Sequence, residues 1–329
     1  MPDEPLVTIV VVPRESFSAA RDSLESVYEN SDISFKLVYV DGGSPARIGR
    51  YLQKKSKENF FELIRTNHYL SPNTARNIGL KKVTTRYVLF LDNDVIVAPG
   101  WLGPLVRCAE ETDAWITGPL LCEGAVLHEI IHSLGGVCEI SARRINDQMM
   151  MQGQRVADAR EKLKREKTGL AEFHCMLVRT DVFKKLGPLD SQMINTREHI
   201  DFCLSVAQAG GSVYVEPQSV ITYISEPRLR LFDIPYYSLR WSDAWELQTL
   251  RHFRQKWDLV EDEYFEKRYC QLGDRRRHAI FRPWARQLGF RKANSRVEEF
   301  LVRIDKKINR FYTDYYAKKY PEATGLPRI

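Results

Sequence analysis

Residues 87–94 read Tyr-Val-Leu-Phe-Leu-Asp-Asn-Asp, an apolar run that ends in two acids. The run Val88–Leu91 has the apolar character of a buried strand. Because side chains alternate along an extended segment, we expect Asp92 and Asp94 on the same side, where the strand ends. Two converging carboxylates repel each other unless a cation lies between them, and hard oxygen ligands suit Mg²⁺ or Mn²⁺. The alternative is a turn with two solvated acids.

Neighbouring segments predict the sheet to which this strand belongs. Further strand-like runs occupy residues 6–12, 36–41, 61–66 and 114–118. Apolar residues recur at helical spacing between the first two runs, and less cleanly between the next two. The alternation of strand and helix predicts an α/β fold with a parallel sheet covered by helices on both faces. Ligands of such sheets bind beyond the carboxyl ends of the strands.

Polar residues follow the predicted strands at those ends. The first strand runs into Pro-Arg-Glu-Ser at 13–16, and the second into Asp-Gly-Gly-Ser at 41–44. Residues 73–79 are interpreted as the first turns of a helix, whose free amides favour an anion together with Arg76. Each signal is weak alone. With the acids of 92–94, they predict a nucleotide whose phosphates are bridged by a divalent ion.

The order and spacing of these motifs, with REHIDFCL at 197–204, resemble the inverting family 2 glycosyltransferases of the GT-A fold. The resemblance covers about residues 6–225, so we expect a catalytic domain over 1–225 and a helical C-terminal region over 226–329. It implies a nucleotide-diphospho-sugar donor, most often UDP-linked. The acceptor would be a hydroxyl of a glycan, glycolipid or protein, and no specific nucleic acid is expected.

The resemblance also implies roles for individual residues. Asp41 would contact the base, Asp92 the ribose and Asp94 the metal, which is Mn²⁺ or Mg²⁺. The complete set of implied nucleotide-binding residues is Pro13, Arg14, Glu15, Asp41, Arg76, Asn77, Asp92 and Asn93, and the implied metal ligands are Asp94 and Asp92.

The catalytic base is expected on a helix that begins near Asn195 or Thr196 and ends at the glycines 210 and 211. Relatives carry Glu-Asp, followed two residues on by Asp, whereas this chain has Glu198-His199-Ile200-Asp201. An inverting transfer needs a group that takes the proton of the acceptor hydroxyl. Either Glu198 or His199 does so, with Glu198 slightly favoured. A third interpretation is that Glu198 only stabilises the start of the helix through the helix dipole and has no catalytic role.

A second departure from the family concerns the metal. Many relatives place a histidine after the last strand, where it completes the metal shell, but this chain has Tyr223 at the nearest position. With His199, this substitution makes a nucleotide-sugar binding protein without catalysis the alternative to an active transferase. Residues 173–178 again predict a strand, and His174 is interpreted as a structural residue.

The segment 128–138, HEIIHSLGGVC, fits the zinc-protease pattern H-E-x-x-H-x-x-G. That site needs a helix, yet Gly124 lies one turn upstream, and Cys138 stands where a third histidine would be expected. The segment is therefore interpreted as a strand and turn near the sugar or acceptor site, with a zinc peptidase as the remote alternative. The charged residues 153–169 predict a solvated helix or loop over the acceptor groove.

Positive charge is concentrated at the C-terminal end of the chain. Residues 226–329 carry 23 Lys and Arg against 15 Asp and Glu, whereas residues 1–225 carry 26 against 28. Aromatic and basic side chains alternate there, which suits an anionic membrane surface or another phosphate-rich partner. The alternative is an ordinary helical region whose arginines are solvated.

The remaining features concern the compartment. The start of the chain, with two acids before a short apolar run, lacks the pattern of a signal peptide, and no apolar run reaches the roughly 20 residues that cross a bilayer. The six cysteines show no paired spacing and are expected to be buried free thiols. A cytoplasmic location is expected, with peripheral contact at the inner face of the plasma membrane.

Overall fold

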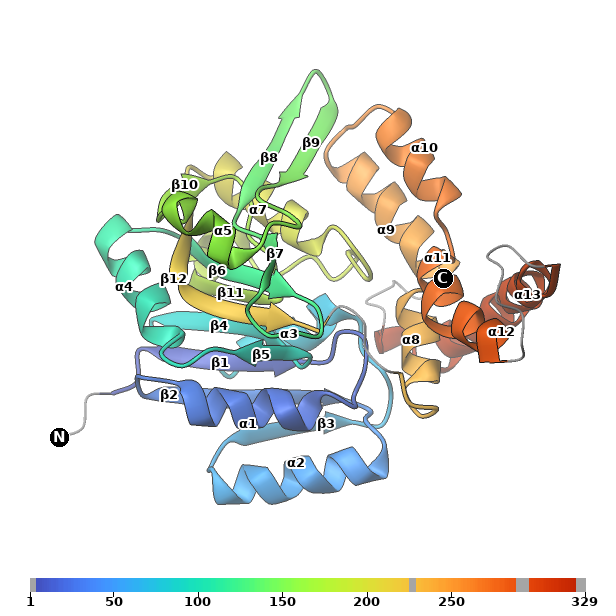
Figure 1. Cartoon of the computed structure of the whole chain (residues 1–329), viewed down its shortest axis with the longest axis horizontal. Coiled ribbons are helices and arrows are strands. Elements are labelled where there is room, and N and C mark those ends of the chain that lie inside the picture. Colours follow the sequence, from blue (N-terminus) through green and yellow to red (C-terminus); the bar gives the residue numbers. More distant parts are fainter. Residues whose placement is uncertain (1–3, 225–228, 288–295, 324–329) are drawn as a thin grey trace.

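The computed structural model describes residues 4–224, 229–287 and 296–323. Its centre is a sheet with the strand order β10-β12-β6-β11-β4-β1-β2-β3, to which β5 and β7 add by pairing with β12 and β6 (Figure 1). A separate hairpin is formed by β8 and β9. The strands are β1 Val7–Val12, β2 Phe35–Gly42, β3 Glu62–Thr66, β4 Tyr87–Asp92, β5 Val95–Val97, β6 Ile116–Glu123, β7 Ile130–Ser133, β8 Gly136–Ser141, β9 Arg144–Met149, β10 Glu166–Thr168, β11 Cys175–Arg179 and β12 Val213–Tyr223.

Helices flank the sheet and make up the C-terminal part of the chain (Figure 1). They are α1 Ala20–Asn30, α2 Ala46–Glu58, α3 Pro72–Leu80, α4 Leu102–Thr112, α5 Val156–Ala159, α6 Val182–Leu186, α7 Glu198–Gln208, α8 Ile234–Arg240, α9 Asp243–Lys256, α10 Glu263–Cys270, α11 Asp274–Arg276, α12 Arg282–Gln287 and α13 Arg296–Lys319. Short 3-10 turns occupy Arg160–Lys162 and Pro321–Ala323, and a π-helical turn occupies Arg277–Phe281. None of these helices is long and apolar enough to cross a bilayer.

The strands from β4 to β3 are parallel, as the sequence predicts. The register pairs Val11 with Tyr39 and Val12 with Asp92, so the carboxyl ends of β1, β2 and β4 lie at one edge of the sheet. The other half is mixed, because β11 runs antiparallel to both β4 and β6. The predicted strand over 87–94 is divided: β4 ends at Asp92, and a turn leads into β5.

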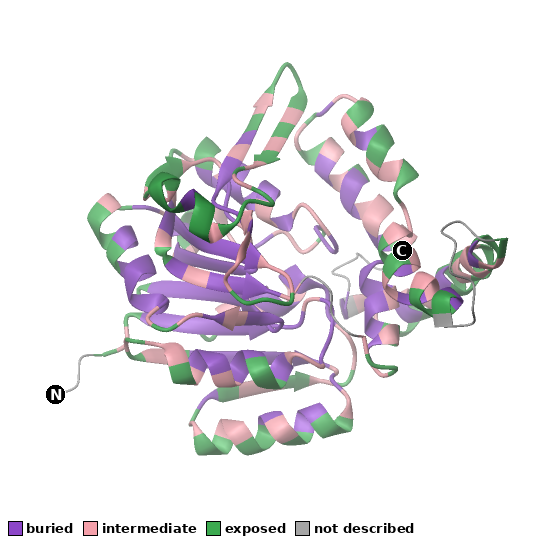
Figure 2. Ribbon diagram, viewed as in Figure 1, coloured by how far each residue is buried: buried purple, intermediate pink, exposed green. Residues whose placement is uncertain are grey.

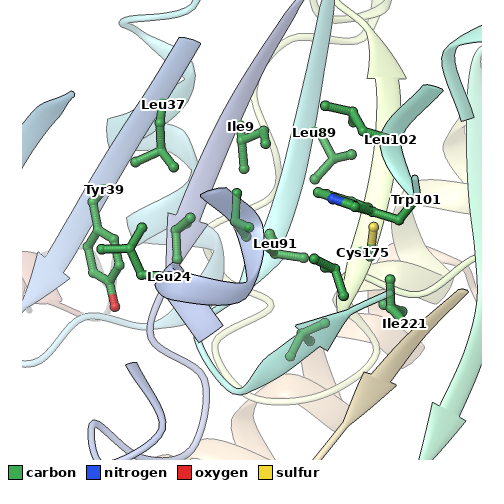
Figure 3. Packing of buried hydrophobic residues seen from close by; sticks show 14 of the residues in the cluster. Ile9, Leu24, Leu37, Tyr39, Leu89, Leu91, Trp101, Leu102, Cys175 and Ile221 are labelled. Carbon is green, nitrogen blue, oxygen red and sulfur yellow. The ribbon is translucent and has the colours of Figure 1, made fainter. Parts of the chain in front are cut away.

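Alternate residues of the central strands face two separate cores. Ile9, Leu89 and Leu91 pack with Trp101 on the side that α1 and α4 cover (Figure 3). The residues between them, such as Val10 and Phe90, pack on the opposite side. Burial on both faces explains the continuous apolar runs in the sequence, and Figure 2 shows the central strands, unlike the β8–β9 hairpin, as largely buried.

The cysteines agree with the expectation of free thiols. All six are free and five are buried, whereas Cys270, on the outer helix α10, is exposed.

The C-terminal helices contact the edge of the sheet where β1 ends. The hydroxyl of Tyr236 donates to the carbonyl oxygen of Pro13 at 3.0 Å, and the amide of Phe17 donates to Asp233 at 2.8 Å. The Tyr236 ring also packs against the Phe17 ring, with centroids 4.9 Å apart. Residues after 228 therefore complete the loops that follow β1, although they lie far from them in the sequence.

Candidate active site

A buried cluster of two acids and a histidine lies at the carboxyl edge of the sheet. Asp92 ends β4, and Asp94 lies in the turn that follows. His174 immediately precedes β11, whose Cys175 pairs with Leu91 of β4. The sheet thus brings together three side chains whose ligand atoms lie within 4.8 Å of one another.

The chemistry of this cluster fits a divalent cation. Within the described part of the chain, neither oxygen of Asp94 nor Nδ1 of His174 has a hydrogen-bond partner, although both side chains are buried. A buried polar group without a partner is costly, and a carboxylate more so. Oxygen ligands with one imidazole suit Mn²⁺ or Mg²⁺. Asp92, Asp94 and His174 therefore have the composition of a metal site.

Two arginines partly balance the charge of these acids. Arg76 donates to Asp92 Oδ1 at 2.9 Å, and Arg14 Nε lies 3.3 Å from Asp92 Oδ2. Burial nevertheless raises the pKa of Asp92 and, to a greater extent, that of Asp94. The Arg14 guanidinium also lies over the ring of Tyr223, 4.6 Å from its centroid. The cluster is thus a site where an added positive charge would be stabilised.

Asp41, which is predicted to contact the nucleotide base, lies near the end of β2, and β1 separates β2 from β4. It accepts hydrogen bonds from the amide and the hydroxyl of Ser44, at 2.9 and 2.8 Å. Arg65 lies 3.3 Å away. A cavity of ≈ 350 Å³ opens beside it, lined by Gly43, Ser44, Arg65, Thr66 and Asn67. Gly43 has φ 74°, and a Cβ there would approach the backbone of His68 to 2.9 Å, so a side chain would disturb this loop.

Other predicted nucleotide-binding residues hold the loops around the cluster. Asn93 accepts from the amide of Arg14 at 3.1 Å and donates to the carbonyl of Ser16 at 2.8 Å, which fixes the segment after β1. Glu15, next in that segment, lies 3.4 Å from the Arg14 guanidinium. Both polar groups of the Asn77 amide bond to the backbone of Leu189, at 2.7 and 3.0 Å. The nucleotide contacts expected of these residues stay predictions.

The helix α7 carries the predicted catalytic residues. It begins at Glu198, later than predicted, because Arg197 adopts a left-handed conformation with φ 68°. Glu198 Oε1 lies 3.4 Å from Arg240 and 3.7 Å from Arg76. Burial opposes the ionised form of Glu198, but the two arginines lower its pKa below the usual value. Arg76 contacts both Asp92 and Glu198, so it joins α7 to the acid cluster.

The other two predicted residues of α7 differ in their surroundings. Asp201 accepts from Trp257 Nε1 and Lys256 Nζ, each at 2.8 Å, so its carboxylate fastens α7 to the end of α9. His199 is half-buried. Burial lowers the pKa of His199, against the opposing effect of Glu172 and Glu198, so its imidazole is neutral at neutral pH and can accept a proton.

The zinc-protease interpretation of HEIIH is wrong. His132 lies on the strand β7, and His128 precedes it with φ 61°, so the two histidines are not one helical turn apart. His128 bonds to the hydroxyl of Thr222 at 2.8 Å, and His132 to Glu123 at 2.8 Å. The segment is a strand and turn, as the competing interpretation predicted.

His132 instead takes part in a chain of charged groups that reaches the acid cluster. Its Nε2 lies 3.3 Å from Glu172, and Glu172 lies 3.8 Å from Nε2 of His174. Burial alone would lower the pKa of His132, but its hydrogen bonds to Glu123 and Glu172 raise it to about 9. The cationic form of His132 therefore balances the buried Glu172 beside the candidate metal site.

Two residues of the site, Glu172 and Arg240, escaped the sequence reasoning, and His174 was given only a structural role. Glu172 and His174 alternate just before the apolar run of β11, and this spacing was a signal that both point to the same side. The His174 ring lies against Tyr223, with centroids 4.1 Å apart. The structural role predicted for His174 is incomplete, because His174 lies in the candidate metal cluster. No local pattern marks Arg240, which reaches Glu198 from α8.

Comparison with known proteins agrees with this architecture. The sequence profile of Glycosyl transferase family 2 matches residues 8–187. The pre-mycofactocin glycosyltransferases of two Mycobacterium tuberculosis strains, CDC 1551 / Oshkosh and ATCC 25618 / H37Rv, are each 23% identical over 230 residues, which is 68% of this chain and 44% of theirs. The chain thus matches less than half the length of these relatives.

A solved structure shows the same fold at lower sequence similarity. GalNAc-T7, crystallised with UDP, GalNAc and Mn²⁺, superimposes with a TM-score of 0.51 at 17% identity, over 82% of this chain and 57% of GalNAc-T7. The central sheet flanked by helices is therefore a GT-A fold. Since the family profile covers more than half of its residues, the chain belongs to glycosyl transferase family 2.

Proposed function

We propose that this glycosyltransferase moves a sugar from a nucleotide-diphospho-sugar, a UDP-sugar by its family resemblance, to a hydroxyl acceptor with inversion and with a divalent metal. The buried Asp92, Asp94 and His174 cluster carries this proposal. It lies at the sheet edge where the GT-A fold binds ligands, and its unpartnered atoms suit a cation that holds a diphosphate.

The reaction is a single displacement at the anomeric carbon of the sugar. The acceptor oxygen forms a bond to that carbon while the bond to the diphosphate oxygen breaks, and its electron pair leaves with the nucleoside diphosphate. The acceptor proton passes to a base on the protein. When bound, the Mn²⁺ or Mg²⁺ would neutralise the charge on the departing diphosphate.

The residues at this edge of the sheet have two roles: some would bind the donor and its metal ion, and another would accept the proton of the acceptor hydroxyl. The cavity beside Asp41 has room for a nucleobase, and Arg65 and Ser44 line it. Asp92, Asp94 and His174 would hold the ion. Arg76, already between Asp92 and Glu198, adds a fixed positive charge beside the diphosphate.

We assign the proton acceptor to His199 rather than Glu198. The Glu198 carboxylate lies beside Arg240 and Arg76, and a carboxylate stabilised by two cations is a weak base. It is placed to hold Arg76 in position. His199, neutral and half-buried on the same turn of α7, keeps a lone pair for the acceptor proton.

The test is a donor panel. The full chain is incubated with Mn²⁺ and UDP-, GDP- and dTDP-linked sugars, and the release of nucleoside diphosphate is measured with and without acceptor extracts. We expect release from one donor class that disappears on metal chelation and in Asp94→Asn. The matched control is Asp22→Asn, an exposed acid of α1, which should leave the release unchanged.

The same panel separates the enzyme from a binding protein. A donor that binds in the presence of Mn²⁺ but is neither hydrolysed nor transferred with any acceptor would indicate nucleotide-sugar binding without catalysis. A chain that binds no nucleotide sugar would contradict both readings.

A further inference from the structure

The C-terminal helix α13 exposes a continuous apolar stripe. The residues Phe300, Ile304, Ile308, Phe311 and Tyr315 have exposed fractions of 60, 39, 62, 75 and 50%. Their spacings of four, four, three and four residues place them on one side of the helix. Scattered exposed apolar residues are ordinary, but an aligned row of five large ones is typical of a binding surface.

The opposite side of α13 faces the protein, and three of its four buried residues are polar. Glu298, Asn309, Thr313 and Tyr316 are its buried residues. Asn309 donates to the carbonyl of Ser238 on α8 at 2.8 Å, and Glu298 accepts from Arg277 at 2.7 Å. A surface helix normally turns its apolar face inward. This helix is held by these polar contacts and by Tyr316, which packs in a buried cluster with Leu239 and Trp245. The row of five large apolar side chains faces outward.

Basic side chains border the apolar stripe. Arg303, Lys307, Arg310 and Lys318 are exposed and follow one another at spacings of three, four or eight residues, so they line one flank of the row. Asp314 and Glu299 are exposed acids near that flank. Residues 226–329, which include α13, are also basic as a whole, with 23 Lys and Arg and 15 Asp and Glu. The stripe and its flank have the composition of a helix that lies in an anionic membrane interface.

We propose that α13 binds the surface of an anionic lipid bilayer, with the stripe Phe300–Tyr315 inserted among the lipids and the basic flank on their headgroups. Charge favours this partner over a second copy of the chain, because two copies paired through the stripe would bring their basic flanks close together. This binding does not depend on the sugar transfer proposed above.

Binding there would also fix the position of the catalytic edge. The hydroxyl of Tyr316, on the inner side of α13, bonds to the backbone amide and carbonyl of Tyr69. Tyr69 lies just before α3, the helix that carries Arg76. A bilayer bound to the outer side of α13 would therefore be held at a set distance from the residues around Asp92.

Vesicle co-sedimentation of the full chain tests the proposal. We expect binding to vesicles of mixed phosphatidylcholine and phosphatidylserine, much weaker binding to pure phosphatidylcholine, and a loss of binding at high salt. Phe300→Ser with Phe311→Ser should weaken binding at least about tenfold. The matched control is Phe60→Ser, which removes a phenylalanine that is 94% exposed at the end of α2.

A charge series tests the headgroup contacts separately. Each neutralisation in the set Arg303→Gln, Lys307→Gln and Arg310→Gln should weaken binding roughly fivefold. The same number of changes on α2, Arg50→Gln, Lys54→Gln and Lys57→Gln, should have little effect. Circular dichroism confirms that the variants fold.

Several outcomes would overturn the proposal. Equal binding to anionic and neutral vesicles, or equal losses in the α13 and α2 series, would exclude a specific anionic surface. A folded full chain that binds neither anionic nor neutral vesicles would also overturn the proposal. So would a chain that sediments as a dimer without lipid, becomes a monomer in Phe300→Ser with Phe311→Ser, and fails to bind vesicles. That last result would assign the stripe to a second copy.

Discussion

At the scale of single residues, the account depends on the acids and the histidine at the end of β4. The eight residues 87–94 were enough to predict the position of Asp92 and Asp94. They follow a buried apolar strand, so both carboxylates are expected at the edge of the sheet where that strand ends. His174 could not be predicted in this way. It lies 80 residues after Asp94 in the sequence, and it reaches the acids only because β11 inserts beside β4.

The position of His174 leads to a prediction about metal affinity. His174→Ala should weaken Mn²⁺ binding at least about tenfold, because one of three protein ligands is lost. The double change His174→Ala with Tyr223→His should restore part of that affinity, since the two rings lie 4.1 Å apart and a histidine at 223 would offer an imidazole nitrogen near the same place. Isothermal titration of each variant with Mn²⁺ measures both effects. Wild-type affinity in His174→Ala would remove His174 from the site.

The assignment of the base gives a second prediction. His199→Ala should lower kcat about a hundredfold or more while the donor affinity changes little, because general base catalysis contributes about that much. Glu198→Gln should lower kcat less and weaken donor binding, since Arg76 loses a partner. Steady-state kinetics with a donor titration separates the two effects. Should His199→Ala keep the wild-type kcat, the base would have to be another group.

At the scale of elements, the packing of α7 and α9 was hidden from the sequence. The sequence pattern predicted the helix α7 but placed its start near Asn195 or Thr196. The helix begins at Glu198, because Arg197 adopts a left-handed conformation. The carboxylates of Asp190 and Asp201 both bind Lys256 of α9, at 3.0 and 2.8 Å. These long-range pairs leave no local periodicity, so only the fold reveals them.

Asp190 makes the stability of this contact dependent on pH. Burial alone would raise the pKa of Asp190, but hydrogen bonds from His252 and Lys256 lower it well below its usual value. A lowered pKa gives stability that is complete above the unfolded value, near 4, and is lost as the pH falls toward the folded value. Asp190→Asn should therefore cost about 1 kcal/mol of unfolding free energy at pH 6 and nothing in strong acid.

Urea unfolding across that pH range measures the difference between the two proteins. Glu139→Gln, which changes an exposed acid in the middle of β8, serves as the control and should match the wild type at every pH. A cost of Asp190→Asn that stays constant into strong acid would show that its effect is not electrostatic.

At the scale of the whole molecule, several contacts join the two expected parts of the chain, residues 1–225 and 226–329. Tyr236, Asp233 and Arg240 all reach residues of the first part, and Arg240 contacts the predicted catalytic Glu198. The sequence indicated a basic helical region, and composition alone gave no sign that this region borders the site. The division itself stays a prediction.

These contacts predict that both parts unfold together. Tryptophan fluorescence should report mainly on the C-terminal part, because Trp241, Trp245, Trp257 and Trp284 are four of the six tryptophans. Far-ultraviolet circular dichroism reports on the whole chain. We expect the two urea transitions to coincide. A fluorescence transition at lower urea would show that the C-terminal helices separate before the sheet unfolds.

We propose above all that carboxylates at one edge of the sheet hold a metal-bound nucleotide diphosphate. The most direct test of this proposal is a crystal grown with UDP and Mn²⁺, in which anomalous scattering locates the manganese. The account predicts one manganese ion bound by Asp92, Asp94 and His174, with the UDP phosphates beside Arg76 and its base in the cavity next to Asp41. Bound UDP with manganese at some other place, or no UDP at this edge, would contradict it.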